Sequence, residues 1–495
     1  GSVASAGLAI LTGTRIVAAT VSGVFRVGTS AASGYDVAFS LALVGAGHLV
    51  GLSVGMAMLT GLIISWAIAV PLLTSMQPPV PDPELTAHTI GIWRSQVRFI
   101  GAGAIAVAAI YTLARLAKPV VGGLVSTLAS SRATEREDDR DRDLSGTWII
   151  ILTIACLLIT GYLAFTFARS TVLASSAISL TLIAIPFVLI GGFLIAGICG
   201  YMAGLIGASN SPISGVGILS IVLCASVLIL AVAPTAITQP ALVAFALFIT
   251  AIVFACATIS NDNLQDLKTG QLVGASPMRQ QIALIVGVIA GASVIPFVLN
   301  LLAKAYGFAG APNVNVVAEN PLPAPQATLI SALAKGVIGG NLEWKMIGIG
   351  ALVGVGLILL DTILGAAKKL RIPPLAVGIG IYLPMSATFA VVIGAVLSEW
   401  YSRRARRTPN PDRAERLGTL VASGLIVGES LWGVLNAGLI VGLSNDAPIA
   451  LVREDFGREL VGFAIGPWLG VLAFAGVLFW LYLWMLRRSR MAPER

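Results

Sequence analysis

The amino-acid sequence predicts an all-α polytopic membrane protein with roughly 11–12 membrane segments, some of them broken or re-entrant. Hydrophobic residues make up 57% of the 495 residues and charged residues only 11%, and the mean hydropathy is +0.93. Apolar runs long enough to cross a hydrocarbon core of ~30 Å recur along the whole chain. A water-soluble core does not have this composition, so soluble classes of protein are excluded.

The charged residues indicate orientation in a membrane and not a nucleic-acid partner. The formal net charge is +8, and the basic residues lie in short runs between apolar stretches and at the C-terminal end. This distribution is typical of the positive-inside bias of membrane proteins. All cysteines lie inside apolar runs without CxxC spacing, at Cys156, Cys199, Cys224 and Cys256. We therefore predict no disulfide framework, no metal site and no cofactor.

Two apolar runs near the start of the chain predict irregular elements. Residues 3–25 are interrupted by Arg15, which allows either a truncated span or an interfacial helix. Residues 37–74 would form a helix of ~57 Å, nearly twice the hydrocarbon thickness, so this run must break. The break is predicted among the glycines of the run, namely Gly45, Gly47, Gly51 and Gly55.

The following elements are spans and loops of one integral membrane domain over residues 1–495. Residues 171–206 would form a helix of ~54 Å, which we expect to be divided or kinked at Pro186 or at Gly191 and Gly192. Polar loops are predicted at 77–84, at 132–145, where the mixed charges indicate the cytoplasm, and at 307–327, which is rich in proline and asparagine. Single spans are predicted at 99–116, 148–167, 214–232, 241–258, 282–302, 346–366, 417–443 and 460–486, with an amphipathic helix at 329–345.

The charges around residues 374–397 conflict. Lys368, Lys369 and Arg371 place the cytoplasm before this segment, and the basic run at 403–416 places it after. A re-entrant hairpin that turns near Pro384 satisfies both, because irregular backbone is tolerated where it lines protein or a watery cavity. The alternative is an ordinary span, in which case one of the two basic loops departs from the positive-inside bias.

The most informative stretch is GYMAGLIGASNSPISGVG at 200–217. Gly204 and Gly207 can end a helix, and Ser211 followed by Pro212 predicts the start of a new one. At membrane depth, the exposed N–H groups of such a break favour a carboxylate-bearing solute. A surface turn between two spans is the alternative. The candidate substrate-binding residues here are Ser209, Asn210, Ser211 and Ser214.

A second polar stretch, ISNDNLQDLKTGQLVGASPMRQQ, occupies 259–281. Its acids suit the amine end of a zwitterionic solute, and Lys268 suits the carboxylate. A solvated loop held by internal ion pairs explains the same composition. The candidate substrate-binding residues are Asn261, Asp262, Gln265, Asp266 and Lys268.

Three ionisable residues inside apolar runs are candidates for proton coupling, because such groups normally face the interior of a bundle. Glu429 shares a helical face with Trp432 and Asn436, which are further candidates for substrate contact. It is either a proton carrier or a structural carboxylate bonded to a neighbouring helix. Asp361 and His48 are the other two candidates. The alternative for Asp361 is a structural ion pair with a nearby cation, and the alternative for His48 is a buried core position whose hydrogen bonds are satisfied.

The sequence resembles the oligopeptide transporter family, especially its yellow-stripe-like branch and the prokaryotic relatives of that branch. The similarity covers most of the chain from about Ala38. It is strongest in GYMAGLIGASNSPISG, NDNLQDLKTGQLVGASPMRQQ and KKLRIPPLAVGIGIYLP.

The resemblance implies an OPT-like transporter fold in a prokaryotic plasma membrane. It also implies secondary-active, proton-coupled import of small peptides or of metal ions bound by amino-acid-derived chelators. The partners implied are this small-molecule substrate, protons and the lipid bilayer, and a homo-oligomer is left open. Family members are usually longer at the N-terminus, so we expect one or more leading spans to precede Gly1.

Other classes of protein remain to be weighed. An intramembrane hydrolase would pair Ser209 or Ser214 with His48, which is one of only two histidines. A passive channel would show conductance in place of saturable uptake. An ATP-driven pump is disfavoured because no GxxxxGK[ST] sequence occurs in the chain.

Overall fold

The computed structural model describes residues 1–130, 142–206, 213–308, 316–318, 321–322, 324–340, 343–453 and 465–490. These residues are mostly α-helical, as predicted. Within them, ten helical stretches are long and apolar enough to cross a membrane, and the apolar helices Ser2–Gly13 and Gly215–Ala231 are shorter than the 18 residues required. The all-α polytopic class is therefore confirmed, with one exception near the N-terminus.

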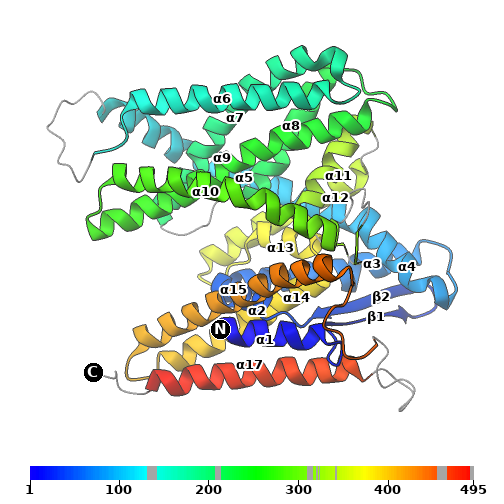
Figure 1. Ribbon diagram of the computed structural model, residues 1–495. Helices are drawn as coiled ribbons and strands as arrows, with labels where there is room; N and C mark the ends of the chain where they lie inside the picture. The colour runs from blue at the N-terminus through cyan, green and yellow to red at the C-terminus, as the bar shows by residue number, and fades with distance from the viewer. Residues whose placement is uncertain are drawn as a thin grey trace. The chain divides into compact units, whose positions relative to one another are not determined.

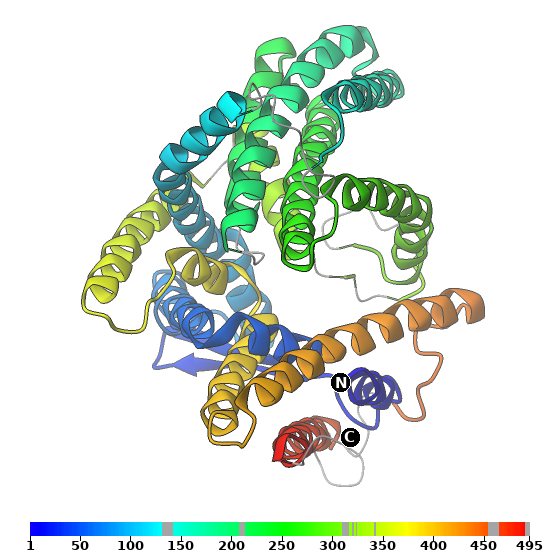
Figure 2. The ribbon, with the colours of Figure 1, turned by 90° about the vertical axis from the view of Figure 1, so that its left-hand side faces the viewer.

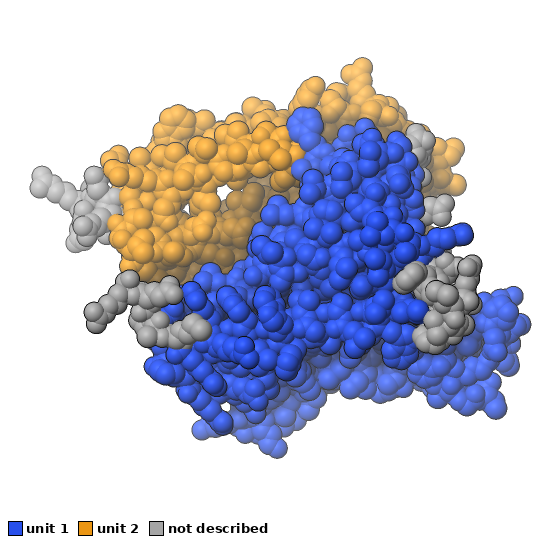
Figure 3. Space-filling view, turned by 60° about the horizontal axis from the view of Figure 1, so that its bottom comes forward, with its two compact units in different colours: residues 1–105, 297–325, 345–495 blue, residues 106–296, 326–344 orange. Residues whose placement is uncertain are grey.

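The chain divides into two compact units, shown in different colours in Figure 3. Unit 1 contains Gly1–Ile105, Phe297–Pro325 and Lys345–Arg495, and unit 2 contains Ala106–Pro296 and Gln326–Trp344. The helices α5 (Arg98–Ser130) and α10 (Pro277–Ala305) contribute to both units.

Unit 1 holds most of the helices of the chain and a short hairpin (Figure 1). Besides parts of α5 and α10, its elements are α1 (Ser2–Gly13), β1 (Thr20–Val27), β2 (Ala31–Ala38), α2 (Leu41–Leu62), the π-helix η1 (Ile63–Ala69), α3 (Val70–Ser75), α4 (Asp82–Ile92), the π-helix η2 (Trp93–Val97), α12 (Trp344–Ala366), α13 (Pro374–Tyr382), α14 (Met385–Ala405), α15 (Pro411–Leu443) and α17 (Gly466–Arg490).

Unit 2 is built around the pairing of α7 with α9. Its elements, besides parts of α5 and α10, are α6 (Gly146–Arg169), the 3-10 helix η3 (Ala174–Ser176), α7 (Ala177–Ile206), α8 (Ile213–Ala231), α9 (Gln239–Val273) and α11 (Pro325–Gly339). Gly192 and Gly200 of α7 face Cys256 and Ser260 of α9, and the Ser260 hydroxyl donates to the Ala196 carbonyl at 2.6 Å. Small residues let two helix backbones approach, which is how helices associate in lipid.

The N-terminal prediction is wrong. Residues 3–25 form neither a span nor one interfacial helix, because α1 ends at Gly13 and the antiparallel hairpin β1–β2 follows, with Thr20 opposite Ala38. The segment TVSGVFRV is rich in β-branched and aromatic residues, which fit a pleated surface. Gly28 has a φ of 70°, so the hairpin loop uses the left-handed conformation that glycine tolerates.

The predicted break of the 37–74 run is confirmed at one glycine. Gly51 has φ 78° and ψ 174°, a region essentially reserved for glycine. Gly47 and Gly55 serve close packing: a Cβ on Gly47 would overlap the carbonyl oxygen of Val391 in α14, and a Cβ on Gly55 would overlap the side-chain Cβ of Ala395.

The segment 374–397 is interrupted near Pro384, which agrees with the first of the two predicted alternatives, and whether it turns back or crosses the membrane stays a prediction. α13 ends at Tyr382, Leu383 is extended, and α14 begins at Met385. With nine residues, α13 is ~14 Å long and too short to span, whereas α14 alone reaches ~31 Å. Both helices pack on α2, where Gly380 meets the backbone of Met58 and Gly394 meets that of Val44.

The predicted division of 171–206 is wrong, and the alternative of a kink at Pro186 or at Gly191 and Gly192 stays a prediction. α7 runs without interruption from Ala177 to Ile206, with Pro186 inside it. The helix is shorter than the apolar run because it begins only at Ala177, after a 3-10 turn at 174–176. Likewise α9 continues beyond its predicted end at 258 to Val273, where Gly274 caps it in the left-handed conformation.

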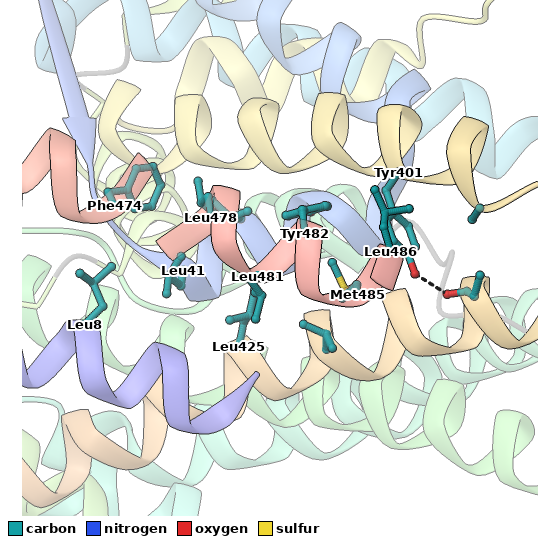
Figure 4. Close-up of a cluster of buried hydrophobic side chains, with 14 of the residues drawn as sticks. Leu8, Leu41, Tyr401, Leu425, Phe474, Leu478, Leu481, Tyr482, Met485 and Leu486 are labelled. Carbon is teal, nitrogen blue, oxygen red and sulfur yellow. Dashed lines mark hydrogen bonds between the residues drawn. The ribbon is translucent and has the colours of Figure 1, made fainter. Parts of the chain in front are cut away.

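The main apolar core of unit 1 lies where α1, α2, α14, α15 and α17 meet (Figure 4). α1 lies beside α15 and α17 (Figure 2). The buried Tyr401 hydroxyl donates to the Ala414 carbonyl at 2.8 Å, which joins α14 to α15. The largest members of the cluster are Leu41, Leu425, Phe474, Leu478, Leu481, Tyr482, Met485 and Leu486.

We predict that Gly47→Ala destabilises the protein by about 1–3 kcal/mol, because the added methyl group overpacks the α2–α14 contact. Gly356→Ala in α12 is the matched control, since a Cβ there meets nothing within 4 Å; it should be neutral or stabilise by about 0.5–1 kcal/mol. Thermal unfolding in detergent measures both. Equal melting temperatures for the two variants would contradict the predicted contact.

Candidate functional site

The helix break predicted around 200–217 lies between described helices. α7 is described as far as Ile206 and α8 from Ile213 onward, and the residues between them, where the break is predicted, lie outside the described part of the chain, so the break stays a prediction. Ser209, Asn210 and Ser211 lie outside the described residues. Ser214 belongs to the first turn of α8. The roles of these four residues stay predictions.

The second polar stretch is helical and not a loop. Asn261, Asp262, Gln265, Asp266 and Lys268 all lie on the C-terminal third of α9. Among the described residues, no ion pair joins its acids to Lys268, whose ammonium donates to the Gln271 side chain at 2.9 Å. The alternative of a solvated loop held by internal ion pairs is therefore wrong, because the helix continues through these residues to Gly274.

Glu429 accepts two hydrogen bonds at the start of α2. The Ser40 hydroxyl donates to Oε1 at 2.7 Å and the Ala42 amide donates to Oε2 at 2.9 Å. Ser40 is also the N-cap of α2, since its hydroxyl accepts from the Leu43 amide at 3.1 Å. The carboxylate thus satisfies one amide that has no intrahelical partner, that of Ala42, and lies at the positive end of the helix dipole.

Trp432 and Asn436 follow Glu429 along α15, and both are half-buried. The Asn436 amide nitrogen donates to the Tyr306 hydroxyl at 2.8 Å. Its carbonyl oxygen Oδ1 is buried and has no hydrogen-bond partner among the described residues. Asn436 therefore keeps an open acceptor ~10 Å along the helix from Glu429.

The His48 ring packs against the rings of Tyr401 and Tyr482, two core tyrosines that Figure 4 labels. Its Nδ1 lies 2.8 Å from the Tyr482 hydroxyl, and its ring centroid lies 5.9 Å from that of Tyr401. The gap lined by His48, Gly418 and Met485 is too tight for a water molecule. The geometry is that of a satisfied core histidine.

Asp361 is buried, with 7% of its surface exposed. It pairs with Arg371 through both carboxylate oxygens, with Nε to Oδ1 at 3.2 Å, and accepts the Ile372 amide at 3.2 Å. This pair joins the end of α12 to the segment that leads into α13. The cationic partner of Asp361 is Arg371 and not Lys368, although Lys368 is closer to Asp361 in the sequence.

A GxSxG pattern occurs as GLSVG at 51–55. A nucleophile elbow needs a sharp strand-to-helix turn that exposes the serine. Ser53 instead lies inside α2, and its hydroxyl donates to the Arg371 carbonyl at 2.6 Å. This serine does not form a hydrolase site.

One buried polar cluster was not predicted from the sequence. It consists of Trp66, Trp93, Arg98 and Tyr382, and we call it the Arg98 cluster. The two tryptophan rings stack at 5.9 Å, and the guanidinium lies 5.2 Å from the Trp93 ring and 4.3 Å from the Tyr382 ring. The signal available in the sequence was an arginine five residues after Trp93, directly before the predicted span at 99–116.

Multiple apolar helices, glycine-mediated packing and polar groups at helix interruptions define an integral, multi-pass membrane protein of the transporter class. The chain belongs to the oligopeptide transporter family, because the family model described as OPT oligopeptide transporter protein matches residues 4–440. The OPT-like fold predicted from the sequence is confirmed.

Similar proteins come from bacteria, plants and yeast. A candidate oligopeptide transporter of Haemophilus influenzae is 40% identical over 495 residues, covering 96% of this chain and 77% of the relative. A candidate metal-nicotianamine transporter of Arabidopsis thaliana is 29% identical over 191 residues, 37% of this chain and 25% of the relative. A candidate oligopeptide transporter of Saccharomyces cerevisiae is 29% identical over 189 residues, 37% of this chain and 24% of the relative. Members of this family are transporters, so the hydrolase alternative is discarded.

We predict unequal effects from breaking the Asp361–Arg371 pair. Arg371→Gln leaves a buried carboxylate without its cation and should destabilise by about 1–3 kcal/mol. Asp361→Asn should cost less, because the Arg371 side chain is 54% exposed and can return to water. Thermal unfolding in detergent measures both, with Lys369→Gln, a change at an exposed residue, as the control. Asp361→Asn proving the more damaging change would contradict this assignment.

Proposed function

We propose that the protein is a secondary-active transporter that imports small oligopeptides or metal chelates, coupled to protons, across a prokaryotic plasma membrane. The observation that carries the proposal is the similarity over 96% of the chain to the Haemophilus influenzae relative, whose name describes oligopeptide transport. Oligopeptides rank before metal chelates, because the metal-nicotianamine relative matches only 37% of the chain.

Substrate contact is proposed for the polar residues that interrupt or line apolar helices. Asn436 supports this role, since its buried open acceptor suits the ammonium or amide donors of a peptide. Trp432 supplies an aromatic surface on the same face of α15. The set also includes Ser209, Asn210, Ser211, Ser214, Asn261, Asp262, Gln265, Asp266 and Lys268.

Proton coupling is proposed to act through Glu429. An ionised carboxylate only accepts hydrogen bonds, whereas a protonated one has a donor in place of an acceptor position. Protonation would therefore weaken the bonds from Ser40 and the Ala42 amide, and with them the attachment of α15 to the start of α2. This links proton binding to the contact between two helices, which a coupled transporter requires.

The other two ionisable candidates for proton coupling, Asp361 and His48, are proposed to support Glu429 and not to carry the proton themselves. Asp361 is held by the Arg371 side chain and by the Ile372 amide, so its proton uptake would break a buried ion pair. His48 is enclosed by aromatic rings. Glu429 is half-buried, and its partners are neutral groups that can release it.

Uptake by the chain reconstituted in proteoliposomes tests the proposed function. We expect saturable uptake of di- to tetrapeptides that increases when the outside is acidified relative to the lumen and that falls when a protonophore collapses the gradient. An iron chelate of an amino-acid-derived ligand is compared in parallel. Conductance with non-saturating flux would instead indicate a channel, and uptake insensitive to the gradient would remove proton coupling.

We predict that Glu429→Gln abolishes the stimulation of uptake by a pH gradient and leaves equilibrium binding of the peptide within about twofold, because the amide cannot exchange a proton. Ser430→Ala is the control, since this neighbouring exposed hydroxyl bonds only its own helix. Unchanged gradient-driven uptake in Glu429→Gln would eliminate Glu429 as the proton carrier.

A further inference from the structure

The Arg98 cluster is assembled where two π-helices of unit 1 meet. Trp66 belongs to η1, Trp93 begins η2, and Arg98 follows η2 directly. Single π-helical turns inside α-helices are rare and frequent at functional sites. The hairpin supports this arrangement, because the Ser33 hydroxyl donates to the Trp66 carbonyl at 2.6 Å. Tyr382 completes the cluster from the last turn of α13, next to the interruption at Pro384.

The cluster contains buried hydrogen-bond donors that are not used. Trp66 Nε1, Trp93 Nε1 and Arg98 Nε are each buried and have no hydrogen-bond partner among the described residues. The Trp93 side chain is fully enclosed, with 6% of the residue surface exposed. Buried donors are nearly always satisfied, because leaving one unpaired costs about 1–3 kcal/mol. Three in one contiguous group indicate a missing acceptor.

The charge of the cluster is also unbalanced. Arg98 donates to the neutral Tyr382 hydroxyl, and among the described residues no carboxylate forms an ion pair with it. It lies near the middle of the candidate span Asp82–Thr112. An intramembrane arginine normally pairs with an anion, since burying an unpaired charge is costly. The missing acceptor is therefore expected to be negatively charged.

We propose that the Arg98 cluster binds the carboxylate of the transported solute, with Arg98 supplying the charge and the two tryptophan N–H groups the remaining hydrogen bonds. This inference rests on the proposed transport function and assigns the substrate class to a carboxylate-bearing molecule. The three donors are buried within unit 1 and not exposed on its surface, so the proposed occupant is a solute and not a lipid headgroup. Guanidinium and N–H donors fit the oxygen atoms of a carboxylate.

Equilibrium binding to the purified chain in detergent tests the proposal. The probes are trialanine, trialanine amide, an iron–nicotianamine complex and succinate. We expect the wild-type chain to bind trialanine roughly 10- to 100-fold more tightly than its amide, the range for one charge-assisted contact. Arg98→Gln should bind the acid and the amide equally. Arg404→Gln is the matched control, because Arg404 lies 4.2 Å from the Trp400 ring but is exposed.

Two milder variants decide the question if Arg98→Gln does not fold. Arg98→Lys keeps the charge and should retain part of the preference for the acid. Trp93→Phe keeps the ring stack and removes one N–H, so it should weaken binding of the acid several-fold and leave binding of the amide unchanged. The same acid-to-amide ratio in the wild-type chain and in these variants would overturn the proposal.

The outcomes separate this inference from the proposed function. Arg98-dependent binding of succinate without uptake of peptides or chelates would refute the proposed function and support the carboxylate site. Uptake of peptide acid and amide at equal rates, unaffected by Arg98→Lys or Trp93→Phe, would support transport and refute the carboxylate site. Failure of the wild-type chain to bind any of the three carboxylate probes would also refute it.

Discussion

The close approach of α2 to α13, α14 and α15 is the contact on which unit 1 depends. It is made by glycines whose missing side chains leave room for the backbone of a neighbouring helix: Gly45 faces Ala422, Gly47 faces Val391 and Gly61 faces Val377. Lipid chains are as apolar as leucine, so apolar burial alone does not hold helices together in a membrane. Backbone contact at small residues provides the attraction, and it tolerates no added atom.

Interruptions of the helices place polar groups at these contacts. α2 kinks at Gly51, η1 and η2 are π-helical, and α13 ends at Tyr382 before Pro384. Each interruption leaves backbone or side-chain groups that a regular helix would satisfy or exclude. Glu429 satisfies one such group, the Ala42 amide at the start of α2. The Arg98 cluster retains donors that nothing in the described chain satisfies.

These two sites have different chemical characters within the same unit. Glu429 is a carboxyl group whose two partners are a hydroxyl and an amide, and we propose that it links proton binding to the contact between α15 and α2. Arg98 is a cation between aromatic rings, and no carboxylate of the described segments forms an ion pair with it. A proton-coupled carrier of carboxylate-bearing solutes requires one group of each kind: one that exchanges a proton and one that binds the solute.

The sequence by itself determined the membrane class, the family and a break among the glycines of 37–74, because apolar length and proline or glycine positions act locally. It offered the interruption near Pro384 as one of two alternatives. It did not determine the hairpin at 20–38 or the helical state of Asn261 to Lys268, where tertiary packing decided between strand, helix and loop. Only the tertiary structure paired Asp361 with Arg371, placed Glu429 at the start of α2 and gathered Trp66 with Arg98 and Tyr382. Those partners are up to 389 residues apart, and no local pattern specifies which distant side chain satisfies a buried polar group.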